Sequence, residues 1–136
     1  MTRLYETYHG RVEFFIVYIK EAHPSDGWVV PANTRAGISV KDPTSLTERR
    51  QVADKACKEL NLRWPCLVDD MKSTVNRAYD AWPTRLYIVG ADGRVAVAGR
   101  RGPAGLAPSI REAEKWLQTF AANPSNGGGA AKAEAP

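Results

Sequence analysis

The stretch that decides the fold runs from residue 13 to residue 28 and reads Glu13-Phe14-Phe15-Ile16-Val17-Tyr18-Ile19-Lys20-Glu21-Ala22-His23-Pro24-Ser25-Asp26-Gly27-Trp28. Its first half is rich in aromatic and β-branched residues, which predicts a buried strand in a sheet covered by helices on both sides. Polar residues follow at the carboxyl end of this strand, where α/β sheets usually bind ligands. We therefore expect His23 to stand at the rim of a site.

Composition indicates one domain and a tail. The chain has 136 residues, of which 43% are hydrophobic and 25% charged, so residues 1–121 can bury a single core. Residues 122–136 are poor in bulky apolar side chains, which predicts a disordered low-complexity tail. The net charge of +4 comes with no nucleic-acid motif, and we interpret the basic residues as solvated surface.

Localisation is inferred from the apolar runs. All of them are far shorter than the roughly 20 residues that span a bilayer, and residues 1–10 lack the apolar core of a signal peptide. We expect a cytoplasmic location and no membrane partner.

The two cysteines, Cys57 and Cys66, show neither a C-x-x-C spacing nor a zinc pattern with the histidines. No metal site is indicated. Cys57 falls on the predicted inward face of a helix, so we expect both cysteines to be small, buried and unreactive, and neither to be a catalytic nucleophile.

The remaining chain alternates helices and strands. The long segment from Lys20 to Pro43 is predicted to be a functional loop. A helix should follow to about Leu60, capped either by Asp42 ahead of Pro43 or by Ser45 with Glu48. Its predicted inward stripe is Leu46, Ala53, Ala56, Cys57 and Leu60. The other predictions are helices at 2–8, 73–79 (with a Ser73 cap) and 108–120, strands at 64–69, 85–89 and 94–98, and a tight turn at 91–93.

Four segments resemble the iodothyronine deiodinase family, which has a thioredoxin-like fold. They are Glu21-Ala22-His23-Pro24-Ser25-Asp26-Gly27-Trp28, Val68-Asp69-Asp70-Met71, Arg85-Leu86-Tyr87-Ile88 and Gly99-Arg100-Arg101-Gly102-Pro103. The resemblance covers nearly everything from Leu4 to Leu117. It implies an α/β fold of thioredoxin-like type, a mixed sheet with flanking helices whose N-terminal strand and most of whose first helix are missing from this chain.

The resemblance also implies roles for individual residues. His23 would supply a proton and Glu21 would partner it, while Arg101 would hold the substrate and Pro83 would lie across the site. From the residues themselves, Trp28 and Trp82 could line an apolar aromatic pocket near the strand ends. The Trp82–Pro83 bond would be cis and close to the His23 loop. No bound cofactor is implied, only an external thiol reductant and a small aromatic or halogenated substrate. From the residues alone, His23 would merely cap its own loop, Glu21 would be solvated and Arg101 would be ordinary surface.

Two departures from the family qualify this function. A second family histidine corresponds here to about Pro43. The reactive selenocysteine or cysteine of the family lies on a turn that precedes everything in this chain, so we expect the true start to lie upstream, with a central strand.

The leading hypothesis is a deiodinase-like oxidoreductase for reductive dehalogenation or related thiol-dependent redox chemistry. The alternatives are a non-catalytic thioredoxin-like module that binds an anionic aromatic ligand, and a peroxidase of the same superfamily, which also needs a thiol.

Overall fold

A computed structural model describes residues 1–123 of the chain. These residues form two units that we describe separately. The middle unit is Val12–Pro83, and the terminal unit joins Met1–Arg11 to the chain from Thr84 onward. None of the helices within residues 1–123 combines the length and the hydrophobicity needed to cross a bilayer.

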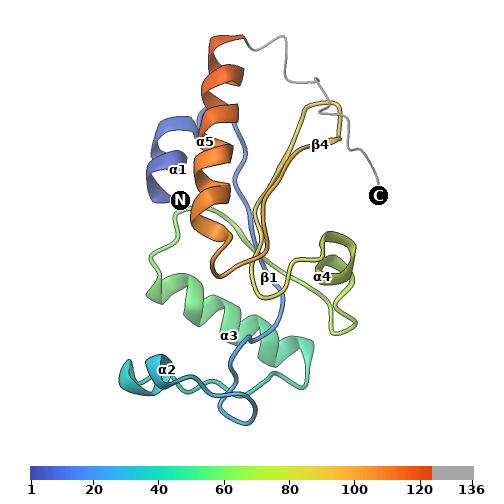
Figure 1. The fold of residues 1–136 in the computed structure, drawn as a ribbon. Helices are drawn as coiled ribbons and strands as arrows, with labels where there is room; N and C mark the ends of the chain where they lie inside the picture. Colours follow the sequence, from blue (N-terminus) through green and yellow to red (C-terminus); the bar gives the residue numbers. More distant parts are fainter. Residues whose placement is uncertain (124–136) are drawn as a thin grey trace. The chain divides into compact units, whose positions relative to one another are not determined.

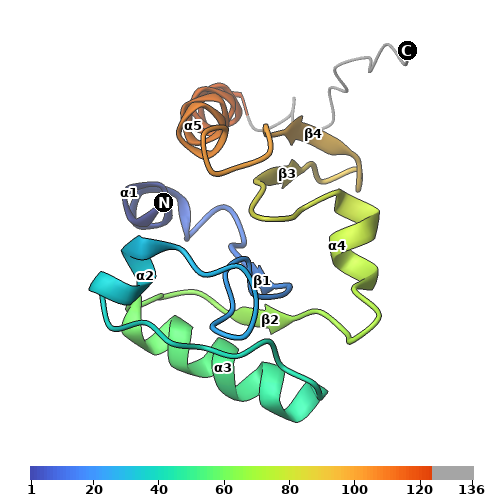
Figure 2. The same ribbon diagram turned by 60° about the horizontal axis from the view of Figure 1, so that its bottom comes forward.

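The middle unit is organised around a parallel pair of strands. Strand β1 (Ile16–Tyr18) lies beside β2 (Cys66–Val68), with Ile16 opposite Cys66 and Tyr18 opposite Val68. Parallel neighbours require a long crossover, and here it contains helix α3 (Leu46–Glu59), which packs against β2 (Figure 2). Strand β1 is thus shorter than the strand predicted at residues 13–19. It is also only half-buried, although Ile19 just beyond it is 9% exposed.

Helix α3 begins where the second predicted capping register places it. The Ser45 hydroxyl accepts a hydrogen bond from the Glu48 amide at 3.2 Å, and the Glu48 carboxylate in turn accepts one from the Thr44 amide at 2.8 Å. The predicted inward stripe is only partly correct. Ala53 is fully buried, but Leu60 is 67% exposed because the helix has already ended at Glu59.

Arg49 is buried on α3 although it was not expected in the core. It is 4% exposed, and its guanidinium donates to the Asp70 carbonyl at 2.6 Å, after β2. The long aliphatic stem can pack with apolar neighbours while Nη1 of the charged head donates to backbone oxygens. Arg49 therefore links α3 to the end of the neighbouring strand.

Two short helices complete the middle unit. Helix α2 (Pro31–Arg35) lies inside the segment that was predicted to be a loop, with Pro31 at its first turn. Helix α4 (Thr74–Tyr79) begins at the predicted place, but the Ser73 side chain does not cap it, since Ser73 has a left-handed backbone with φ of 55°. Its amides are bound by the two carboxylates that follow β2, Asp69 and Asp70.

Asp69 holds the start of α4. It is 1% exposed, and its carboxylate accepts from the amides of Val75 and Asn76, each at 2.9 Å. Asp70 accepts from the amide of Thr74 at 3.0 Å. These bonds satisfy the amides that a helix leaves unpaired at its first turn, so both carboxylates have structural roles.

The terminal unit contains an antiparallel hairpin, which lies beside helix α5 (Leu106–Ala122) in Figure 1. Strand β3 (Tyr87–Val89) pairs with β4 (Val95–Ala98) through the predicted turn, where Gly93 has φ of 76°. Helix α5 starts two residues before its predicted bound and packs against β4. Its buried side is formed by Ser109, Ala113 and Leu117.

Helix α1 (Thr2–Tyr8) lies alongside α5 in both Figure 1 and Figure 2. Leu4 and Tyr8 are its buried residues, and the Arg3 guanidinium binds the Glu114 carboxylate at 2.6 Å. The helix ends at His9, whose ring donates to the Tyr5 carbonyl at 2.9 Å. At this end of the helix dipole a ring N–H is favourable.

The α/β class is confirmed, but the expected single mixed sheet is not formed. Within residues 1–123 the four strands make two two-stranded sheets, one parallel and one antiparallel. The predicted tail at residues 122–136 lies outside the described residues, except for Ala122, which ends α5, and Asn123.

Candidate functional site

The His23 ring is held by its own loop. Its Nδ1 lies 3.3 Å from the carbonyl oxygen of Trp28, and the two rings meet edge to face with centroids 4.7 Å apart. A carbonyl can only accept a hydrogen bond, so Nδ1 carries the proton and Nε2 is left for other partners. The hydrogen bond to this backbone carbonyl therefore selects the tautomer of the ring.

Glu21 lies between β1 and His23 and is half-buried. Burial raises the pKa of its carboxyl above the ordinary value, the negative charge of Asp42 raises it further, and His23 acts in the opposite direction. The electrostatic effect of His23 shows that the two predicted partners are near each other. The effect of His23 on this pKa is the weakest of the three. The surroundings of Glu21 therefore disfavour its charged form more than His23 stabilises it.

A cavity of about 1090 Å³ opens beside Glu21, between the loop and α3. Its walls carry the carboxylates of Asp26 and Asp42 as well as apolar side chains such as Ile38 and Val40. The Asp26 carboxylate accepts a hydrogen bond from the Asp42 amide at 3.0 Å and so closes the loop on itself. Asp42 was weighed only as a helix cap, and its effect on Glu21 could not be found from the sequence.

Trp82 and Pro83 end the middle unit. The Trp82–Pro83 peptide bond is cis, and so is Gly102–Pro103 in the terminal unit. The Lys20 ammonium lies 5.5 Å from the centre of the Trp82 ring, in cation–π geometry. Lys20 directly precedes the predicted site residue Glu21. The contact therefore joins the segment after β1 to the last residues of the middle unit.

Trp28 is the more exposed of the two predicted aromatic residues. It is 68% exposed, with His23 against one edge of its ring. An exposed indole beside a histidine offers a face on which an aromatic ring can stack.

Arg101 lies in the terminal unit, and its side chain is exposed. It belongs to the turn at residues 99–103 between β4 and α5, which we call the basic turn. Backbone bonds fix this turn. The Gly99 amide donates to the Leu86 carbonyl at 2.8 Å, and the Gly102 amide to the Thr84 carbonyl at 2.7 Å.

The hydroxyl of Ser109 completes the support of the basic turn. It is fully buried, accepts from the Arg100 amide at 2.7 Å and donates to the Gly105 carbonyl at 2.7 Å. Sequence reasoning did not single out Ser109, although a serine on an otherwise apolar helix face was a visible signal. The structure thus brings His23, Glu21 and Trp28 together in one loop and holds Arg101 on a separate, rigid turn.

The thiols do not resemble an activated nucleophile. Both cysteines are partly exposed, which corrects the expectation that they are buried. Burial raises the pKa of the Cys66 thiol to about 12, with a further contribution from the adjacent thiol of Cys57. A thiol with such a pKa is almost wholly protonated at neutral pH. In the described part of the chain, His, Cys, Asp and Glu side chains form no group of three that could hold a metal.

Comparison with known proteins identifies the class to which this fold and loop belong. A family model for iodothyronine deiodinase matches residues 1–121. The chain belongs to the iodothyronine deiodinase family.

Individual relatives agree with this assignment. Thyroxine 5-deiodinase of Sparus aurata is 37% identical over 121 residues, which cover 87% of this chain and 42% of the relative. Type II iodothyronine deiodinase of Homo sapiens is 31% identical over 118 residues, which cover 85% of this chain and 42% of the relative. The chain therefore spans about two fifths of the length of the curated relatives it matches.

Proposed function

We propose that this chain forms the substrate-binding and proton-donating part of a deiodinase-like oxidoreductase with a thioredoxin-like fold. The observation that carries the proposal is the His23 ring, whose Nδ1–H is bound to the Trp28 carbonyl, which leaves Nε2 for a substrate. Membership of the deiodinase family supports it.

The proposed reaction replaces an aryl iodine by hydrogen. A thiolate or selenolate attacks the iodine, a proton from Nε2 of protonated His23 goes to the aryl carbon, and the carbon–iodine bond breaks. The sulfur–iodine or selenium–iodine species that results is then reduced by an external thiol, which releases iodide. The nucleophile in this scheme is neither Cys57 nor Cys66.

The supporting residues have distinct roles. Glu21 is the carboxylate partner of His23, and Trp28 and Trp82 offer aromatic faces to a phenolic ring. Arg101 binds the carboxylate of an amino-acid substrate by charge-assisted hydrogen bonds. Pro83 shapes the backbone between Trp82 and the strand that follows. No bound cofactor takes part in this proposal.

Calorimetric titration of the 136-residue chain with thyroxine tests the binding part. Arg101→Ala should weaken binding by about 1.5–3 kcal/mol, about 10- to 150-fold, the usual effect of losing a hydrogen bond to a charged group. Arg111→Ala, a matched exposed arginine on α5, should leave the affinity unchanged. Equal affinities for the parent and Arg101→Ala would remove Arg101 from the site.

Iodide release tests the catalytic part. The protein encoded by the complete gene is incubated with thyroxine and dithiothreitol, beside its His23→Asn variant. We expect release by the parent and a loss of kcat in the variant, because asparagine cannot donate a proton in this way. Binding of thyroxine without any iodide release would instead support the alternative, a non-catalytic module for an anionic aromatic ligand.

A further inference from the structure

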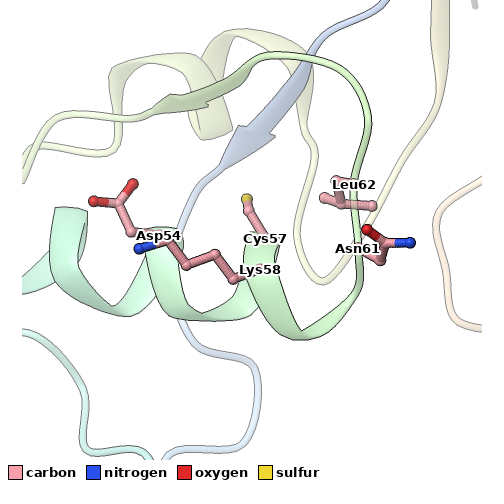
Figure 3. Close-up of a pocket in the computed structure, with 5 residues that line it drawn as sticks. All are labelled: Asp54, Cys57, Lys58, Asn61 and Leu62. Carbon is pink, nitrogen blue, oxygen red and sulfur yellow. The ribbon is translucent and has the colours of Figure 1, made fainter.

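Packing of α3 on β2 brings the two cysteines of the chain together. Cys57 lies in the last turn of α3, Cys66 is the first residue of β2, and α3 packs against β2, so that each thiol lies in the surroundings of the other. Alternation along β2 explains the contact. Leu67 points to the opposite face and is 49% exposed, so Cys66 faces the helix. Figure 3 shows the Cys57 sulfur directed from α3 toward the strands.

A cavity gives small molecules access to Cys57. It has a volume of about 360 Å³ and is lined by Asp54, Cys57, Lys58, Asn61 and Leu62 (Figure 3). This is many times the roughly 30 Å³ occupied by a water molecule. Since both thiols are also partly exposed, a small oxidant can reach Cys57 without unfolding of the unit.

The surroundings give the two thiols different roles. The pKa of Cys66 is raised to about 12, so almost none of this thiol is present as the reactive thiolate at neutral pH. Cys57, which lines the cavity, is therefore the attacking group. Its place at the carboxyl end of α3 gives no help from the helix dipole, so the reaction should be slow.

We propose that Cys57 and Cys66 form a reversible intramolecular disulfide that ties α3 to β2, with a hydroperoxide as the oxidant. The Cys57 thiolate attacks the peroxide, a sulfur–oxygen bond forms as the oxygen–oxygen bond breaks, and the leaving hydroxide takes up a proton to become water. The Cys66 sulfur then attacks the Cys57 sulfur, the sulfur–oxygen bond breaks, and the Cys66 proton leaves with the hydroxyl as a second water.

The electrons balance in this sequence. The two thiols lose two electrons, the peroxide gains them, and a thiol reductant reverses the step by exchange. The disulfide does not depend on the proposed deiodinase function, because neither sulfur takes part in that scheme.

Mass spectrometry of the 136-residue chain after peroxide treatment tests the proposal. The reduced protein is treated at high dilution with hydrogen peroxide, and we expect a monomer that has lost two hydrogen atoms and yields a peptide pair linking Cys57 to Cys66. In Cys66→Ser, the sulfenic acid of Cys57 should be trapped by dimedone. In Cys57→Ser, Cys66 should react far more slowly.

Thermal unfolding supplies a second readout. The disulfide closes a short loop between α3 and β2, and the oxidised parent should melt about 5–15 °C above the reduced parent. The double variant Cys57→Ala/Cys66→Ala should melt at the same temperature with and without peroxide. Two thiols that remain open to alkylation after peroxide, or disulfide-linked dimers alone, would overturn the proposal.

Discussion

The Nδ1 atom of His23 donates to the carbonyl oxygen of Trp28, five positions further along the same loop. The bond selects a ring tautomer that the imidazole of histidine does not prefer in water. When the His23 ring is neutral, Nδ1 carries the proton and Nε2 does not.

Nitrogen-15 NMR of the imidazole rings tests this tautomer. At a pH where the rings are neutral, we expect His23 to show a protonated Nδ1 and an unprotonated Nε2. His9 is a built-in comparison, because its Nδ1 also faces a backbone carbonyl, that of Tyr5. His23→Gln assigns the signals by removing one set. An Nε2–H tautomer at His23 would contradict the hydrogen bond on which the proposed proton transfer depends.

Glu21→Gln should stabilise the chain at pH 7. Since burial, and then Asp42, raise the pKa of this carboxyl in the folded state, folding favours its protonated form. The resulting penalty is absent below the ordinary pKa of 4.5, grows as the pH rises through that value, and is complete above the raised one. We expect the variant to gain about 2 °C in Tm at pH 7 and nothing at pH 4.

The exposed Glu112 of α5 supplies the control for this pH dependence. Glu112→Gln should melt like the parent at both pH values. A gain for Glu21→Gln that is equal at pH 4 and pH 7 would show that its cause is not the carboxyl charge.

Asp69→Ala should be strongly destabilising. The buried carboxylate accepts hydrogen bonds from the amides of Asp70, Val75 and Asn76. Its removal leaves those donors without partners beside a cavity, and we expect a loss of about 3–4 kcal/mol in the free energy of unfolding by urea. Asp92→Ala, on the exposed hairpin turn, is the comparison and should lose less than about 1 kcal/mol. A loss at Asp69 no larger than at Asp92 would mean that α4 does not depend on this carboxylate.

Gly99→Ala tests the packing of the terminal unit. A Cβ at this position would lie 2.7 Å from the Leu86 carbonyl oxygen and 2.7 Å from the Ser109 side chain. Both neighbours are held by hydrogen bonds, so we expect the free energy of unfolding to fall by about 2–3 kcal/mol. Gly10→Ala introduces the same methyl group with nothing within 4 Å and should be nearly neutral. Equal melting of the two variants would show that the basic turn can move away from α5.

Local chemistry explains what the sequence predicted well. The start of α3 follows from Ser45 and Glu48, whose side chains bind backbone amides next to them in the chain. The hairpin follows from Gly93, which takes the left-handed conformation that the turn needs. Both signals depend only on neighbouring residues, so sequence alone was sufficient.

The remaining features depend on contacts between distant residues. Ser73 was predicted to cap α4, but a stronger acceptor, the buried Asp69, reaches the same amides from the end of β2. The effect of Asp42 on Glu21 requires the loop to fold back on itself. Likewise the approach of Cys57 to Cys66 exists only once α3 lies on β2. Periodicity placed Cys57 on the correct face without revealing its partner.

For the candidate site, the loop was predicted, and the interpretation from the residues alone, that His23 caps its own loop, agrees with its hydrogen bond to the Trp28 carbonyl. His23 and Glu21 were chosen from a resemblance, and the structure places them near each other in the middle unit. The partner of Nδ1 is a backbone carbonyl, which no side-chain pattern can indicate. Arg101 was assigned to an exposed basic turn, as found, but the buried hydroxyl of Ser109 that supports this turn was not recognised.

The hydrogen bonds of the basic turn also determine how fast a protease can cleave the chain there. Arg100 and Arg101 form an exposed dibasic sequence, the preferred cleavage site of trypsin, yet the amides of Gly99, Arg100 and Gly102 are bound to Leu86, Ser109 and Thr84. A protease active site needs an extended segment of several residues, so cleavage must wait until these bonds open. The rate of tryptic cutting after Arg100 and Arg101 is therefore a direct measure of how often the hairpin and α5 separate in the native protein.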